Sequence, residues 1–145
     1  MSLVFRNVDV EPGTPVEEWP YEALVTVVER GGVRDWAQLT RAIRARPWGS
    51  VARSVETYLG YARPYGVAPL LARVLASSRA DAERAERAEV VRRVTAAIAR
   101  SGLGREAFAR EIGTSRSRLS TYASGAVVPS AALLVRMERV APQEG

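Results

Sequence analysis

The sequence predicts an all-α fold, in which an N-terminal helical domain is joined by a long helix to a C-terminal bundle of short helices. Apolar residues recur at intervals of three and four through most of the chain, the spacing of helices with one buried face. Glycine and proline divide this pattern into short segments, whereas residues 70–101 contain neither. We expect the domains to comprise residues 1–84 and 85–145.

The composition narrows the possible functions. The chain has 145 residues, enough for two small domains, and it contains no Cys, no His and no Lys. It therefore offers no disulfide or thiolate metal site, no histidine base and no lysine for Schiff-base chemistry. We expect a non-enzyme without catalytic, cofactor or metal residues. No apolar run has the length of a membrane span and Met1–Val10 lacks a signal-peptide pattern, so we expect a soluble cytoplasmic protein.

The first third of the chain predicts three or four helical segments. Ser2–Val10 is rich in Val, Leu and Phe and is consistent with a short strand or an ordered arm. Thr14–Glu17 has the spacing of a capping box and predicts a turn of helix, followed by a main helix over Pro20–Arg30 that stops at Gly31-Gly32. The inner face of that helix is predicted to consist of Leu24, Val27 and Val28.

Two further helices follow before residue 64. Asp35–Gln38 has a second capping-box spacing and predicts a helix to about Arg44, ended by Pro47. Ser50 is predicted to cap the next helix, which Pro64 ends. The apolar faces of the two helices are expected to comprise Trp36, Leu39 and Ile43, then Val51, Val55, Tyr58, Leu59 and Ala62.

All three tryptophans, Trp19, Trp36 and Trp48, lie in this N-terminal half. Aromatic side chains of this size are usually buried, so we expect them to belong to the core. The alternative is an exposed patch for a partner protein or a ligand.

A single helix is predicted from about Val67 to Arg100. Its middle, Ser77–Glu89, consists mainly of Ala, Arg and Glu, which all favour helix, and it carries opposite charges four residues apart. At 1.5 Å per residue such a helix is roughly 50 Å long. A break near Ser77-Ser78 is the alternative. The first apolar half is expected to comprise Val67, Leu70, Leu71, Val74 and Leu75, and the middle offers Ala76, Ala80, Ala85 and Ala88 for pairing with a second copy.

The stretch Gly102–Ser130 predicts two short helices that meet at a sharp corner. Gly113 can adopt the left-handed backbone that ends the first helix, and Ser115 can cap the second. Gly125 ends the second helix, and Pro129-Ser130 begins another. The buried faces are predicted to contain Leu103, Ala107, Phe108 and Ile112 in the first helix, and Leu119 and Tyr122 in the second. The outer face of the second helix is then left with Arg116, Ser117, Arg118, Ser120 and Thr121.

A helix, a tight turn and a second helix with a basic outer face fit the major groove of DNA. The charge distribution agrees with this interpretation. Val90–Gly145 contains nine arginines and four acidic residues, whereas Met1–Gly60 contains seven and eight. The net charge of +5 therefore comes mainly from the segment that carries the two helices.

This segment resembles the helix-turn-helix of the Cro/lambda-repressor-like (XRE) family, over about Glu89–Ala141. The resemblance is carried by a leucine after glycine, a small residue between the helices, a glycine at the turn, a serine cap, an aliphatic residue and a Pro-Ser pair; these are Leu103, Ala109, Gly113, Ser115, Leu119 and Pro129-Ser130. It implies a lambda-repressor-like helix-turn-helix bundle that binds double-stranded DNA. The sequence departs from the family at Gly104 and Arg105, where Ser or Thr and then Gln are usual, and at Ala123, where an acid is common.

The resemblance also implies roles for individual residues. Arg116 lies near the start of the recognition helix, from which arginine most often reads guanine. Arg118 is as consistent with a phosphate contact as with a base contact, and Ser117, Ser120 and Thr121 can touch either. Ser115 caps the helix and favours a nearby phosphate. Arg105 takes the place of a residue that contacts the DNA backbone.

Two function hypotheses remain open at this point. The first is a sequence-specific transcriptional regulator that acts as a homodimer on a pseudo-palindromic operator. The alternative is an antitoxin-like protein, whose N-terminal domain binds a partner protein while its C-terminal domain autoregulates an operon. Neither hypothesis requires a cofactor or a membrane.

Overall fold

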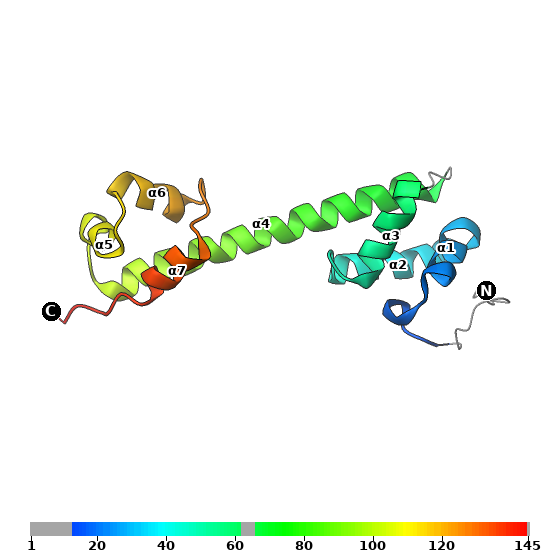
Figure 1. The fold of residues 1–145 in the computed structure, drawn as a ribbon, viewed down its shortest axis with the longest axis horizontal. Helices are drawn as coiled ribbons and strands as arrows, with labels where there is room; N and C mark the ends of the chain where they lie inside the picture. Colours follow the sequence, from blue (N-terminus) through cyan, green and yellow to red (C-terminus); the bar gives the residue numbers. More distant parts are fainter. Residues whose placement is uncertain (1–12, 62–65, 145) are drawn as a thin grey trace. The chain divides into compact units, whose positions relative to one another are not determined.

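The computed structural model describes residues 13–61 and 66–144, and every regular element within these ranges is a helix (Figure 1). The predicted all-α fold is confirmed for this part of the chain. The strand or arm proposed for Ser2–Val10 and the helix end proposed at Pro64 lie outside the described residues. The elements are η1 (Val16–Glu18), α1 (Tyr21–Arg30), α2 (Val33–Ala45), α3 (Ser50–Tyr61), α4 (Val67–Ser101), α5 (Arg105–Ile112), α6 (Arg116–Ser124) and α7 (Ala131–Glu138).

The chain divides into two compact units, Met1–Ala82 and Glu83–Gly145, and each unit has its own hydrophobic core. The division falls two residues before the boundary expected at residue 84. Both units take part of α4, which is continuous from Val67 to Ser101, so the predicted unbroken helix is confirmed and the break near Ser77-Ser78 is not found. Pro69 is tolerated because it lies in the first turn, where its missing N–H would have no helical partner.

The core of the N-terminal unit is built from one face each of α1, α2, α3 and the first part of α4. Leu24 and Val27 of α1, Leu39 and Ile43 of α2, and Val55 of α3 are almost completely buried. Leu71 and Val74 of α4 complete this core, as the apolar spacing predicted. Leu70 does not belong to it and is 52% exposed, because the core covers the opposite side of that helical turn.

Two of the three tryptophans lie at the edge of this core. Trp19 donates its indole N–H to the carbonyl of Thr14 at 2.9 Å, and Trp36 donates to that of Val27 at 3.0 Å. Their rings pack against the buried residues while the polar nitrogen is satisfied. The core assignment is wrong for Trp48, which is 46% exposed in the turn between α2 and α3.

Two helix starts differ from the predicted capping boxes. The residue before η1 is Pro15, and no side-chain cap is found there, so Thr14 does not have the predicted role. In α2 the cap residue is Gly32, and Asp35 is the third helical residue, whose carboxylate accepts the backbone N–H of Gly32 at 3.0 Å. The helix therefore begins earlier than predicted, because a carboxylate can stabilise a helix start from within its first turn.

Tyr58 of α3 connects the core to a carboxylate of α1. Its side chain is 4% exposed, and its hydroxyl donates to Oε1 of Glu29 at 3.0 Å. Burial, and then the bond to Glu29 and its negative charge, raise the pKa of Tyr58 to about 12. The phenol is therefore held in its neutral form well above its ordinary pKa.

The C-terminal unit is a bundle of the last turns of α4 with α5, α6 and α7. Its core contains five side chains that are 1% exposed or less: Val94 of α4, Phe108 and Ile112 of α5, Leu119 of α6 and Met137 of α7. The small Ala109 is also buried, which allows α5 and α6 to pack closely.

An ion pair ties α7 to α4 on the surface of this unit. Arg93 donates through Nε and Nη2 to the two carboxylate oxygens of Glu138, at 3.1 and 2.5 Å. Arg100 donates to the backbone carbonyl of Glu138 at 3.1 Å. The hydrogen bond from Arg93 lowers the pKa of the Glu138 carboxyl.

Candidate nucleic-acid interface

The corner between α5 and α6 is fixed by the backbone of Gly113 and by two polar contacts. Gly113 has φ of 77°, a left-handed conformation that side chains other than glycine rarely adopt. The amide of Thr114 donates to the carbonyl of Ala109 at 2.9 Å, and Arg136 of α7 donates to that of Ile112 at 2.9 Å. The carbonyls of Ala109 and Ile112, at the end of α5, therefore keep hydrogen-bond partners as the chain turns.

Helix α6 begins as the sequence predicted. The hydroxyl of Ser115 accepts the backbone N–H of Arg118 at 3.2 Å, so Ser115 is the N-cap. Gly125 ends the helix with φ of 83°, and Ser130 caps α7 by accepting the N–H of Leu133 at 3.1 Å. By contrast, Gly104 precedes α5 without a side-chain cap.

The packing of α6 separates a buried face from a polar one. Leu119 and Tyr122 are buried as predicted, and Ala123 is buried beside them. The predicted site residues on this helix lie elsewhere on its circumference: Ser115, Arg116, Ser117 and Arg118 are exposed, and Ser120 and Thr121 are half-buried. Arg105 is also exposed, but it is the first residue of α5 and not part of this face.

The hydroxyl groups on α6 are partly committed to the helix itself. Thr121 donates to the carbonyl of Arg118 at 2.6 Å, and the hydroxyls of Ser115 and Ser117 lie 3.2 Å apart. In this conformation the Thr121 hydroxyl keeps its acceptor lone pairs for an outside donor. The half-buried Ser120 has no side-chain hydrogen bond to any residue that the structure describes.

Ser124 belongs to the same polar face, although it is not among the residues that the sequence predicts for it. It is exposed and lies seven residues after Ser117, which places the two side chains on one side of the helix. Its hydroxyl donates to the carbonyl of Thr121 at 3.2 Å and accepts the N–H of Ala126 at 3.3 Å. The seven-residue spacing from Ser117 could have predicted Ser124 on this face. Gly125, however, follows directly and marks Ser124 as the last residue of the helix.

The arginines of this region differ in their partners. Within residues 13–61 and 66–144, no carboxylate forms an ion pair with Arg105, Arg116 or Arg118, whereas Arg93 is paired with Glu138. Their three positive charges thus stay available to an outside anion. In the same ranges no group of acidic side chains is arranged to hold a metal ion, and no helix is both long and apolar enough to cross a membrane.

Comparisons of the chain with protein-family models, with curated proteins and with solved structures find no match. The resemblance to the Cro/lambda-repressor-like family therefore rests on the residues of the helix-turn-helix segment themselves.

Proposed function

We propose that the protein is a sequence-specific regulator that binds duplex DNA through α6. The observation that carries the proposal is the exposed α6 surface, on which Arg116 and Arg118 have no carboxylate partner among the described residues while Leu119 and Tyr122 are buried behind them. A capped, basic helix held rigidly by a neighbouring helix is the arrangement that presents side chains to the major groove.

The proposed roles follow from position. Arg116 is the first residue of α6, and the N-terminal residues of a recognition helix reach base edges, so Arg116 is assigned to guanine O6 and N7. The N-terminus of α6, with Ser115, favours a phosphate. Arg105 is assigned to a phosphate of the DNA backbone.

The active form in this proposal is a homodimer. Two copies related by a two-fold axis would present two α6 helices to half-sites about one helical turn apart, so the operator would be a pseudo-palindrome. The N-terminal unit would then supply contacts outside the DNA, either with the second copy or with a partner protein.

The first experiment is selection of bound sites from random duplex DNA by the purified full chain. The expected product is a pseudo-palindrome with a guanine in each half-site. Binding should weaken steeply as salt rises, because bound arginines release counterions from DNA. Failure to bind any duplex at low ionic strength would contradict the proposal.

Two arginine variants test the residue assignment on the selected site. Arg116→Ala should cost about 1–3 kcal/mol of binding and relax selectivity at one base pair. Arg105→Ala should weaken all duplexes alike and reduce the salt dependence. Arg34→Ala, which changes an exposed arginine of the N-terminal unit, is the control and should bind as the parent does. Parent-like binding by folded Arg116→Ala and Arg105→Ala would refute the assignment.

The antitoxin-like alternative is favoured by one observation in the N-terminal unit. Trp48 is 46% exposed, and exposed aromatic side chains are enriched where proteins bind one another. Binding of a protein through this unit is compatible with DNA binding through α6.

A further inference from the structure

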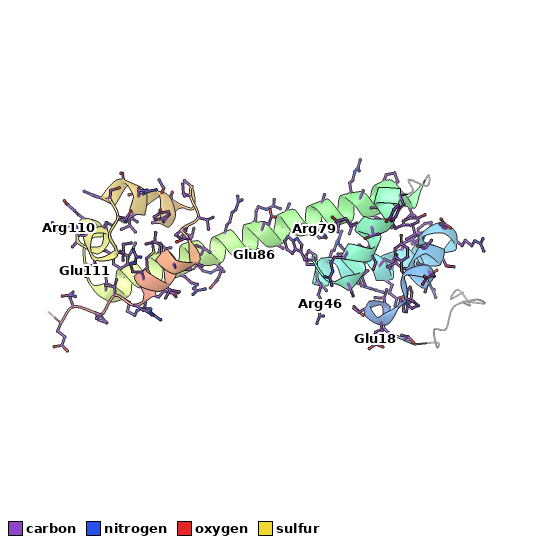
Figure 2. All side chains as sticks on the ribbon, in the orientation of Figure 1. Glu18, Arg46, Arg79, Glu86, Arg110 and Glu111 are labelled. Atoms are coloured by element: carbon purple, nitrogen blue, oxygen red, sulfur yellow. The ribbon has the colours of Figure 1, made fainter. Side chains whose placement is uncertain are left out.

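Aromatic and arginine side chains gather on one surface of the N-terminal unit. Trp48 lies in the turn between α2 and α3, and the guanidinium of Arg79, on α4, lies 5.9 Å from the centre of its ring. Figure 2 labels Arg79 on α4 and Arg46, which directly precedes this turn and is exposed. Trp and Arg are enriched in protein interfaces and among the residues that dominate binding energy.

Arg79 holds this surface in a fixed geometry. Its Nε donates to the carbonyl of Pro47 at 2.9 Å, and its Nη2 lies 2.5 Å from Oε2 of Glu56 on α3. These two contacts connect α4 to α3 and to the turn. The side chain of Arg79 is 23% exposed. The guanidinium of Arg79 therefore lies beside the Trp48 ring, and such a contact lowers the cost of ordering the ring when a partner binds.

A shallow hollow of about 490 Å³ continues the surface along α3. Among the described residues it is lined by Arg53, Glu56, Thr57, Gly60 and Tyr61. Gly60 contributes no side chain, which leaves the space open beside Tyr61, whose side chain is 84% exposed. A hollow beside an exposed aromatic ring can accept an apolar side chain of a partner.

The charge of the surface indicates what the partner carries. Glu56 is paired with Arg79, whereas Arg46 and Arg53 are exposed and form no ion pair with a described residue. The net charge is therefore positive. A second copy related by a two-fold axis would bring like charges together, which is unfavourable. A partner with carboxylates around an apolar side chain is complementary to this surface.

We propose that this surface, made of Arg46, Trp48, Arg53, Glu56, Tyr61 and Arg79 and here named the Trp48 surface, binds an acidic protein segment with an aromatic or aliphatic anchor. The anchor fills the hollow beside Tyr61, and flanking carboxylates pair with Arg53 and Arg46. This role goes beyond DNA binding and does not depend on it.

The experiment is selection from a phage-displayed library of random peptides on the full chain. Enriched peptides should combine Asp or Glu with a large apolar residue, and their binding should shift the emission of Trp48 to shorter wavelength as the ring leaves water. Arg53→Glu should lower the affinity of these peptides by about tenfold or more, and Tyr61→Ser by about threefold or more. Both side chains are exposed, so both variants should fold.

Matched controls come from the start of α2, about 20 Å along that helix from the Trp48 surface. Arg34→Glu repeats the charge reversal and Val33→Ser the loss of an exposed apolar side chain, and neither should change peptide affinity more than about twofold. Arg53→Glu and Tyr61→Ser should bind duplex DNA as the parent does, so that failure here is distinguishable from failure of the DNA proposal.

Four results would overturn the proposal. The first is the absence of enriched peptides, and the second is the enrichment of neutral or basic peptides. The third is a set of peptides whose binding is lost in Arg116→Ala but kept in Arg53→Glu, because such peptides would bind α6 as mimics of DNA. The fourth is self-association in analytical ultracentrifugation, or binding of single-stranded oligothymidine, that Tyr61→Ser abolishes. Such a result would assign the Trp48 surface to a second copy or to nucleic acid.

Discussion

The outer face of α6 and the Trp48 surface both carry arginine, but they use it in opposite ways. On α6 the exposed Arg116 and Arg118 alternate with Ser115 and Ser117 in the sequence and have no carboxylate partner in the described chain. On the Trp48 surface, Arg79 is shared between a carboxylate, a carbonyl and an aromatic ring. The comparison teaches that the neighbours of an arginine, more than the number of arginines, indicate what a surface binds.

The two surfaces also differ in bulk. The side chains around Arg116 are mostly Ser and Thr, which allow a helix to approach the floor of a groove closely. Next to Arg79 lies the ring of Trp48, and Tyr61 contributes a second exposed ring to the Trp48 surface. The first composition suits base edges and phosphates, and the second suits an apolar anchor on another protein.

The largest expected effect is on the stability of the two units, because each of the two surfaces belongs to a unit with its own core. Phe108→Ala removes a fully buried ring from the C-terminal core and should destabilise that unit by about 3–5 kcal/mol, abolishing DNA binding. All three tryptophans lie in the N-terminal unit, so its urea transition can be followed separately by tryptophan fluorescence. That transition should stay near its parental midpoint, while helix content measured by circular dichroism falls. Ile43→Ala is the matched control and should shift the fluorescence transition; a large shift with Phe108→Ala would show that the cores are not independent.

A smaller effect sharpens the assignment of α6 to phosphate contact. Ser115→Asp keeps a good N-cap and adds a negative charge that the helix N-terminus favours, so stability should be retained. The same charge should repel phosphate and lower affinity for the selected duplex by about tenfold, or about 1.4 kcal/mol. Ser130→Asp makes the identical change at the N-cap of α7 and should leave DNA binding nearly unchanged. Affinity for the duplex is measured by fluorescence anisotropy. Equal losses of affinity in the two variants would contradict the assignment of the phosphate contact to the start of α6.

The last effect is a pH dependence confined to the N-terminal unit, and it concerns stability instead of binding. Because the chain has no Cys and no Lys, tyrosines are the side chains that titrate between pH 9 and 12. The pKa of Tyr58 is about 12 in the folded unit and about 10 in an unfolded chain. The stability contributed by its neutral form is therefore fully present below pH 10 and is lost as pH rises toward 12. The urea midpoint by tryptophan fluorescence should fall over this interval.

Tyr58→Phe should remove most of that fall, although it also loses the hydrogen bond to Glu29. Tyr61→Phe changes a tyrosine that is 84% exposed and should keep the parental pH dependence. An unchanged pH profile in Tyr58→Phe would mean that another group controls alkaline stability.

Local signals predicted the C-terminal unit better than the N-terminal one. Gly113 ends a helix, and Ser115 and Ser130 cap helices, through backbone groups only a few residues away. Sequence spacing alone therefore predicts their roles. The sequence predicts Asp35 as an N-cap, but Asp35 acts from the first turn of α2, because a carboxylate can stabilise a helix start from either position.

Burial could not be predicted where distant elements decide it. Leu70 fits the apolar spacing of α4 but is exposed, because α1 to α3 cover only one side of that helix. Trp48 is 46% exposed and its ring lies beside Arg79, 31 residues further along the chain, so its surroundings are not set by its sequence neighbours. Helical spacing predicts the outer-face residues Arg116, Ser117, Arg118, Ser120 and Thr121, while Ser115 follows from its cap position and Arg105 from the family resemblance. The Trp48 surface depends on three elements meeting and has no signature in any one of them.

The middle of α4 has a consequence for hydrogen exchange and for sequence tolerance. From Ala80 to Glu89 nearly every side chain is exposed, so these turns are maintained by backbone bonds and by neighbouring charges along the helix. Their amides should exchange with deuterium sooner than those near Leu71 or Val94 at either side. The exposed alanines of this stretch make few contacts with other helices of the described chain, so another residue that favours helix should replace one of them at little cost.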